Sequence, residues 1–216
     1  MKKNQNVLAG ILLLVGFAVW TFLIQEVDVQ PIGPNGSSVG FAALNGWFHQ
    51  LTGVHWMLYT LTDWLGLVPI CVCLIFAGAG FVQLVQRRSI FKVDLDIIML
   101  GAYYVLVIFG YLLFEIVPIN YRPVLIEGFL EASYPSSTTL LVLSVMPTLY
   151  FQAQRRLTAN ALRQTILIFS ILFSAFMVIG RLVSGVHWLT DIMGAVLLSS
   201  GMFQIYKACV NLLCKE

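Results

Sequence analysis

Long apolar runs, separated by short polar segments, extend from one end of the chain to the other. A membrane-spanning helix needs about 20 mostly apolar residues, and segments rich in charge, Pro or Gly mark where such runs end. The runs that fit this pattern lie at residues 7–24, 66–86, 97–117, 137–152, 164–181 and 189–208. The pattern therefore predicts an all-α, polytopic membrane protein built as a six-transmembrane helix bundle.

The segment between the first two runs is expected to hold a loop and then a shorter helix. The stretch VDVQPIGPNGSSVG is too polar and too rich in Pro and Gly for a span. In the residues that follow, apolar side chains recur at helical spacing; they are Phe41, Leu44, Trp47, Phe48 and Leu51. This pattern predicts an interfacial helix between spans one and two, lying on the membrane surface. An early start of the second span, through residues 53–65, is the alternative.

Composition agrees with a protein that lies almost entirely in the membrane. Of the 216 residues, 59% are hydrophobic and only 10% are charged, and the mean hydropathy is +0.89, beyond the range of ordinary soluble domains. We therefore expect a single membrane-embedded domain over residues 1–216, with the first run as a retained anchor. No zinc-type spacing, Gly-rich phosphate loop or nucleic-acid-binding patch is found in the sequence. No metal, cofactor or nucleic-acid partner is expected.

Basic residues are distributed unevenly among the segments that join the runs. Ten of the twelve Lys and Arg fall on one side of the predicted bundle: two at the N-terminus, three at 87–92, three at 155–163 and two after 206. The positive-inside rule assigns this side to the cytoplasm, so both termini are predicted to be cytoplasmic. The loops at 25–65, 118–136 and 182–188 then face outward. The small size suits a multi-pass protein of a bacterial plasma membrane.

Arg122 and Arg181 are the two basic residues that remain on the outer side. A basic residue there opposes the topological bias, so each is expected to have an anionic partner. His187 and Asp191 lie four positions apart at the start of the last span, which places them within side-chain reach on one helix face. Asp191 can fix the tautomer of the imidazole, and Arg181 can bind a phosphate with parallel hydrogen bonds. Ionisable groups of both signs at membrane depth predict a functional site.

A purely structural role is the alternative for each of these residues. Arg181 would then extend toward the membrane surface, His187 would lie at the interface, and Asp191 would cap the helix or pair with Arg181. A second stretch, YPSSTTLLVL, predicts a helix start at which free N–H groups, together with Ser136 and Ser137, form an anion site. Plain N-capping of the fourth span explains that stretch equally well.

Together these residues resemble the type-2 phosphatidic acid phosphatase superfamily, membrane lipid phosphatases whose relatives include vanadium haloperoxidases. Its motifs are Lys followed seven positions later by Arg-Pro; Pro-Ser-Gly-His; and Ser-Arg, with His six after the Arg and Asp four after that His. The third motif is matched by Arg181, His187 and Asp191, with Gly180 where Ser is usual. The resemblance covers residues from about 100 to 195.

The resemblance implies a role for each matching residue. His187 would be the nucleophile that forms a phosphohistidine, with Asp191 as its orienting partner. Arg122 and Arg181 would hold the phosphate oxygens, and the phosphate cradle would be completed by Ser136, Ser137 and Thr138. The implied partner is a phosphorylated membrane lipid within the bilayer, and the implied chemistry requires no metal.

Two positions depart from the superfamily motifs. Glu115 stands where the first motif has Lys, and Thr138 stands where the second has the His thought to protonate the leaving group. A phosphate monoester expels an alkoxide, whose conjugate acid is nearly as weak an acid as water. Loss of the acid should therefore slow its hydrolysis roughly 100- to 10,000-fold. A lipid diphosphate expels a phosphate with a second pKa of about 6, which predicts a preference for diphosphates such as undecaprenyl diphosphate.

Other interpretations of these departures stay open at the level of sequence. Glu115 is a possible proton donor if burial raises its pKa, as are Tyr134 and His55 if the loops fold over the site. Glu115 could instead pair with Arg122 or Arg181. A third possibility is a catalytically weak or inactive protein that binds, transports or senses a phosphorylated lipid.

Overall fold

The computed structural model describes residues 2–214, and this part of the chain is predominantly helical, as predicted. Lys215, which contributes to the predicted cytoplasmic charge, lies outside the described residues, as do the side chains of Lys2 and Lys3. The helices are α1 (Lys2–Glu26), α2 (Ala42–Thr52), α3 (Trp56–Leu65), α4 (Leu67–Arg87), α5 (Leu95–Ile116), α6 (Ser137–Arg156), α7 (Asn160–Val183) and α8 (Leu189–Leu213). Two short 3-10 turns, η1 (Pro34–Gly36) and η2 (Ile90–Lys92), lie in the connections.

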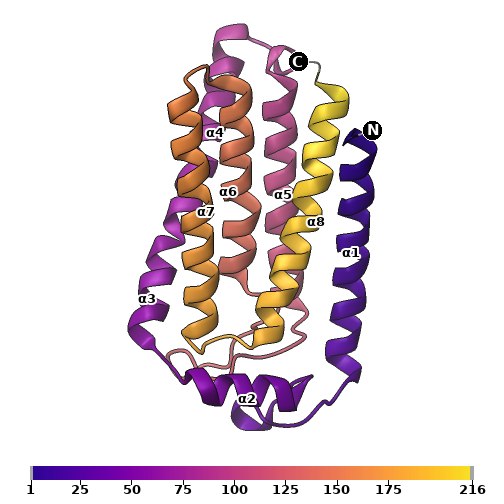
Figure 1. The fold of residues 1–216 in the computed structure, drawn as a ribbon, viewed down its shortest axis with the longest axis vertical. Helices are drawn as coiled ribbons and strands as arrows, with labels where there is room; N and C mark the ends of the chain where they lie inside the picture. Colours follow the sequence, from indigo (N-terminus) through magenta and orange to yellow (C-terminus); the bar gives the residue numbers. More distant parts are fainter. Residues whose placement is uncertain (1, 215–216) are drawn as a thin grey trace.

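The long helices run side by side as a bundle with two different ends (Figure 1). One end, here called the terminal end, holds both chain termini and the α4–α5 and α6–α7 connections. The other, the loop end, holds α2, the connection from α5 to α6 and the turn from α7 to α8. The predicted outer loops therefore gather at one end of the molecule.

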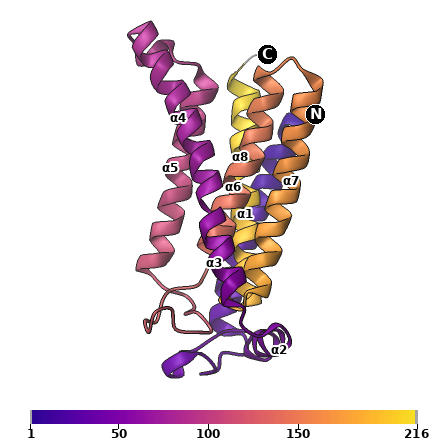
Figure 2. The same ribbon diagram turned by 90° about the vertical axis from the view of Figure 1, so that its left-hand side faces the viewer.

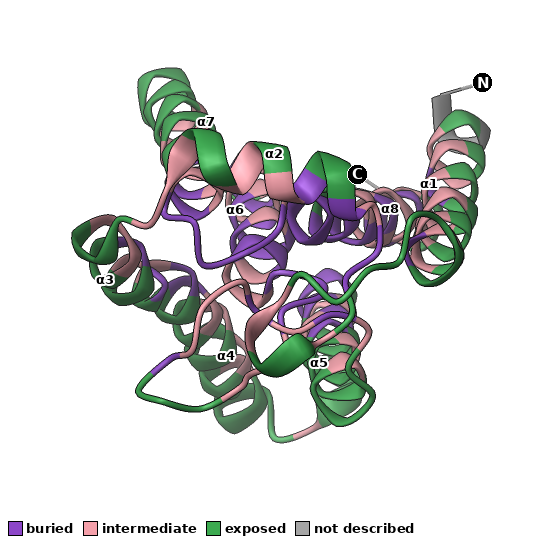
Figure 3. Ribbon diagram, turned by 90° about the horizontal axis from the view of Figure 1, so that it is seen from below, coloured by how far each residue is buried: buried purple, intermediate pink, exposed green. Residues whose placement is uncertain are grey.

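Helix α6 occupies the middle of the bundle, in contact with α4, α5, α7 and α8. Its polar side chains Ser144, Thr148 and Gln152 are fully buried, and Figure 3 shows buried residues concentrated on α6 and α8. Five helical segments of the described chain are long and apolar enough to cross a membrane, and α6 is not one of them. A helix enclosed by other helices does not need an apolar surface toward lipid, which explains its polarity. The six-span count stays a prediction.

The region between the first two spans contains both of the elements considered for it. Helix α2 forms at the place predicted for the interfacial helix, although its position at a membrane surface stays a prediction. Residues 56–65 are also helical, and Figure 2 shows α3 leading into α4 along nearly the same line. The second apolar segment is thus Trp56–Arg87, which begins ten residues before the predicted start at 66. Both alternatives therefore describe part of the segment.

The connection between α5 and α6 folds back on itself as a short hairpin. Isolated bridges join Tyr121 to Ala132 and Ile126 to Phe129. Glu127 and Gly128 at its tip have φ values of 50° and 86°, the left-handed conformation that two-residue hairpin turns require. After the turn, the returning strand of the hairpin passes next to Arg122 and leads into the start of α6.

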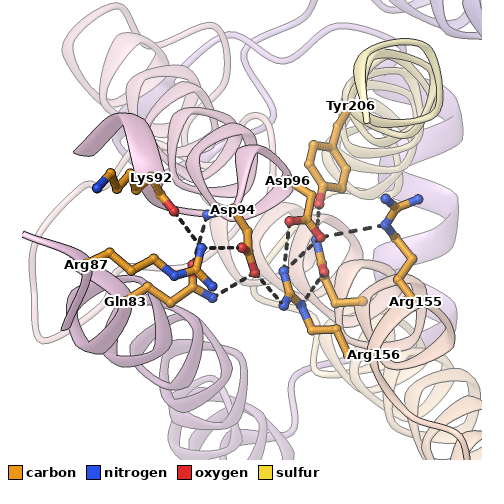
Figure 4. A network of polar contacts seen from close by, with 9 residues as sticks. Gln83, Arg87, Lys92, Asp94, Asp96, Arg155, Arg156 and Tyr206 are labelled. Carbon is orange, nitrogen blue, oxygen red and sulfur yellow. Dashed lines mark hydrogen bonds and ion pairs between the residues drawn. The ribbon is translucent and has the colours of Figure 1, made fainter. Parts of the chain in front are cut away.

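A network of ion pairs connects the helices at the terminal end (Figure 4). Arg156 of α6 donates to both carboxylate oxygens of Asp96 at 2.8 Å and to Asp94 at 3.2 Å. Arg87 of α4 pairs with Asp94 at 2.7 Å, and Arg155 lies 3.6 Å from Asp96. These contacts attach the α4–α5 connection to the central helix at the end opposite the candidate site.

Candidate active site

Four separate segments bring the predicted site residues together at the loop end. Arg122 comes from the hairpin, Ser137 from the start of α6, Arg181 from the last turn of α7, and His187 from the short turn before α8. Asp191 follows in the first turn of α8. Arg122, Arg181, His187 and Asp191 are each at most 8% exposed. The structure therefore gathers the candidate residues below the surface of the loop end.

Asp191 faces His187 and is itself held by two donors. Its Oδ2 atom lies 3.8 Å from Nδ1 of His187, longer than a hydrogen bond. The same oxygen accepts the backbone N–H of Trp188 at 2.9 Å, so Asp191 also caps α8, as one structural alternative proposed. Asn120 of the hairpin donates its side-chain amide to Oδ1 at 3.3 Å. The carboxylate is thus fixed beside the imidazole.

The other ring nitrogen of His187 faces Arg122. Nη1 of Arg122 lies 3.4 Å from Nε2 of His187. Because a guanidinium has no acceptor, Nε2 must be the acceptor in this contact, which assigns the proton of the neutral ring to Nδ1, on the side of Asp191. The lone pair of Nε2 therefore points toward Arg122, and an electrophile bound there would take the place of the guanidinium N–H as its partner.

Burial keeps the imidazole of His187 uncharged. Loss of hydration lowers its pKa well below 6.5, and the positive charges of Arg122 and Arg181 lower the pKa further. A neutral imidazole at physiological pH is the form that can act as a nucleophile.

Each of the two arginines forms an ion pair that the motifs do not include. Nε of Arg122 lies 3.0 Å from a carboxylate oxygen of Glu131, its cross-strand neighbour in the hairpin. Nη1 of Arg181 lies 3.6 Å from Asp63 of α3, and its guanidinium stacks over the ring of Tyr59 at 4.8 Å. The arginines thus pair with Glu131 and Asp63 rather than with Glu115.

Close packing of α3 against α7 accounts for Gly180, the residue that departs from Ser in the third motif. A Cβ atom at position 180 would lie 2.7 Å from Cγ2 of Thr62. Nη1 of Arg181 reaches Oγ1 of the same threonine at 3.5 Å. Without a side chain at 180, α3 can approach α7 closely enough for Tyr59, Thr62 and Asp63 to contact Arg181.

Two adjoining cavities lie at the loop end, and Arg122 and His187 line one of them. The first, of about 220 Å³, is polar; Glu115, Arg122, Glu131, Ser133 and His187 are among its lining residues. The second is an apolar groove of about 260 Å³ between α3, α4, α5 and α6, and its walls include Ile70, Val107 and Leu141. Tyr111 and Ser137 line both, so the polar cavity and the groove share a wall.

The remaining predicted residues occupy different places around these cavities. Ser137 reaches the polar cavity and Thr138 lines the apolar groove, whereas the buried hydroxyl of Ser136 donates to Thr139 at 3.1 Å. Tyr134 also lines the polar cavity, but burial raises the pKa of its phenol, which makes it a poorer acid. His55 is exposed, and its Nε2 contacts the carbonyl of Thr52 at 2.8 Å.

Sequence reasoning missed several residues that contact the predicted ones; they are Tyr59, Thr62, Asp63, Asn120, Glu131 and Ser133. Asn120 and Glu131 were within the predicted outer loop, and a polar side chain two positions before Arg122 was a signal that could have been followed. Asp63 lies in residues 53–65, for which the sequence allows either a loop or an early start of the second span, so no signal places Asp63 near Arg181.

The fold and the site define a helical membrane protein with a buried histidine, aspartate and two arginines at one end of its bundle. The sequence model of the PAP2 superfamily matches residues 99–213. The chain therefore belongs to the PAP2 superfamily, the group that its motifs resemble. The segment matched contains Arg122, Arg181, His187 and Asp191.

A solved structure extends the likeness to nearly the whole chain. It is described as the first transmembrane PAP2-type phosphatidylglycerolphosphate phosphatase from Bacillus subtilis, with a TM-score of 0.65 and 15% sequence identity. The match covers 95% of this chain and 98% of that one, so the N-terminal helices outside the superfamily match belong to the same fold. A search of curated proteins finds no match.

Proposed function

We propose that this chain is an integral-membrane lipid phosphatase that acts through a phosphohistidine intermediate and prefers lipid diphosphates to monoesters. The observation that carries the proposal is the position of His187. Its Nε2 atom lies 3.4 Å from the guanidinium of Arg122, it lines a polar cavity, and its pKa is well below 6.5. A neutral nucleophile beside a fixed positive charge is the arrangement that phosphoryl transfer requires.

In the proposed first step, Nε2 of His187 attacks the terminal phosphorus and a P–N bond forms. The bond from phosphorus to the leaving oxygen breaks, and that oxygen takes the electron pair. Arg122 and Arg181 stabilise the charge on the remaining phosphate oxygens, and Asp191 stabilises the ring as it becomes positive. In the second step water attacks the phosphorus, the P–N bond breaks, inorganic phosphate leaves and the histidine returns to its neutral form.

The preference for diphosphates follows from the leaving group. With Thr138 in place of the histidine of the second motif, the leaving oxygen has no matching proton donor. A lipid monophosphate can leave unprotonated near neutral pH, because its second pKa is about 6. A polyprenyl diphosphate such as undecaprenyl diphosphate is therefore the proposed substrate class, ahead of phosphatidate or phosphatidylglycerol phosphate.

The apolar groove supports a lipid substrate. It shares a wall with the polar cavity, so a lipid tail in the groove would place its head group next to His187. The uneven charge of the two ends supports an orientation with both termini in the cytoplasm and the site on the outer face of the membrane. The chain would then be a multi-pass protein of a plasma membrane, which in our proposal is bacterial.

Purified protein in detergent would test the proposal through a panel of lipid mono- and diphosphates, with phosphate release as the measurement. We expect diphosphates to turn over faster, and His187→Ala to abolish turnover and a phosphohistidine signal. Faster turnover of monoesters would remove the substrate preference. Phosphate binding without turnover or phosphohistidine would identify the alternative, a protein that binds, transports or senses a phosphorylated lipid.

A further inference from the structure

Each arginine of the proposed phosphate site is paired with a carboxylate in the structure. Arg122 pairs with Glu131 at 3.0 Å, and Arg181 pairs with Asp63 at 3.6 Å. The two carboxylates come from different segments, the hairpin and α3. Neither position belongs to the superfamily motifs.

The members of each pair differ in how firmly they are held. The side chains of Arg122 and Arg181 are 10% and 1% exposed, whereas those of Glu131 and Asp63 are 40% and 59% exposed. A buried guanidinium without a partner is costly, but a partly exposed carboxylate can turn outward and regain water. In each pair the arginine is therefore the fixed member and the carboxylate the movable one.

Both carboxylates also line the space that a phosphorylated lipid would occupy. Glu131 lines the polar cavity together with His187, and Asp63 lines the apolar groove together with Ser137. A phosphate that binds the two arginines would compete with these carboxylates for the positive charge of each guanidinium.

We infer that Glu131 and Asp63 are displaceable counter-ions, which prevent weakly charged lipid head groups from binding to the two arginines. This inference rests on the proposed phosphate site. Most membrane phospholipids are phosphodiesters with one negative charge on the phosphate, the same charge that each carboxylate already provides. A terminal phosphate carries about −1.5 to −2 at neutral pH. Such a phosphate has the additional attraction needed to displace the carboxylates, and a diester does not.

The inference predicts a gain of binding when a counter-ion is neutralised. In Glu131→Gln and in Asp63→Asn, the dissociation constant for inorganic phosphate should fall roughly 1.5-fold to fivefold, as expected for partly exposed ion pairs. Dimethyl phosphate, a soluble phosphodiester, should bind measurably to the double variant and not to the unaltered protein. A structural role predicts the opposite sign, because a loosened arginine would bind phosphate less well.

The measurement is calorimetric titration of the purified full-length protein in detergent at pH 8, with Arg122→Gln as the blank for the site. Glu127→Gln, at the exposed tip of the same hairpin, is the matched control and should leave both affinities unchanged. Glu131→Gln lies in the hairpin and Asp63→Asn lies in α3, so if one of these variants fails to fold, the other still tests the inference.

Weaker or unchanged phosphate binding in folded Glu131→Gln and Asp63→Asn would overturn the inference. If such protein still hydrolyses lipid diphosphates, the proposed function stands without it. Tighter phosphate binding in a protein that shows no hydrolysis would support the counter-ions and remove the proposed function.

Discussion

Returning Gly180 to serine, the usual residue of the superfamily motif, is expected to damage this chain rather than improve it. The new Cβ would lie 2.7 Å from Cγ2 of Thr62, at least 0.7 Å closer than the 3.4 Å at which ordinary contact begins. Thr62 cannot rotate away freely, because its hydroxyl donates to the carbonyls of Leu58 and Tyr59 at 2.8 and 3.0 Å. Helix α3 must therefore move away from α7 and from Arg181.

The expected size of this effect is that of overpacking in a well-packed interior, about 1–3 kcal/mol. If half or more of it appears as weaker binding of the transition state, kcat/KM should fall roughly threefold to a hundredfold. The methyl group of Thr62 is the atom responsible, so Thr62→Ser should relieve the contact while keeping the oxygen near Arg181.

A double-mutant cycle on the two positions separates this contact from other effects. Thermal unfolding in detergent and kcat/KM for a lipid diphosphate would be measured for both single variants and for the pair. We expect the pair to be more active and more stable than Gly180→Ser alone, with a coupling of about 0.5–3 kcal/mol. Full activity in Gly180→Ser, or no recovery in the pair, would refute the argument from packing.

Three further predictions concern the charged groups of the site. Nuclear magnetic resonance of labelled histidines should show His187 titrating below pH 6.5, with Arg122→Gln moving the midpoint upward. Because the unfolded chain binds this proton more readily, the contribution of His187 to stability should fall as pH decreases below 6.5. A midpoint at or above 6.5 would contradict this. Asn120→Ala should lower kcat about tenfold with little change in KM, since Asp191 loses a donor; an unchanged kcat would remove its positioning role. Glu115→Gln should keep diphosphate hydrolysis within about threefold of the parent, whereas a loss near the hundredfold expected for a general acid would make Glu115 the proton donor.

The residues that sequence could bring together are those placed by helical spacing and by the alternation of spans. His187 and Asp191 lie four apart, and helical spacing predicts that they share one face. In the structure α8 begins at Leu189, after His187, so the two are not on one helix face. They meet because Asp191 turns back to cap the helix at the N–H of Trp188, next to His187. The alternation of inner and outer loops predicts that Arg122 and Arg181 lie on the same side of the membrane. This prediction requires only the number of spans, not how the spans pack. In the structure these four residues lie near one another at the loop end.

The counter-ions could not be predicted in the same way, because they depend on register and docking. The turn at Glu127 and Gly128, continued as a regular hairpin, would place Ser133 opposite Arg122. The observed hydrogen bond instead runs from the N–H of Arg122 to the carbonyl of Glu131, next to Pro123, which has no N–H to continue the ladder. The periodicity of apolar residues in the sequence cannot predict such a shift of register.

The place of Thr138 gives physical sense to its departure from the motif. Thr138 lines the apolar groove, and it is absent from the wall of the polar cavity that contains His187. A lipid bound with its tail in the groove would have its leaving oxygen on this side of the phosphorus, opposite the attacking nitrogen, as an in-line displacement requires. A proton donor is useful at that place only if the leaving oxygen must be protonated, which is so for an alkoxide and not for a phosphate. Position 138 would then face the leaving group, and an enzyme that acts on a diphosphate would not need a proton donor at this position. A small threonine there would also leave the groove open to the lipid tail.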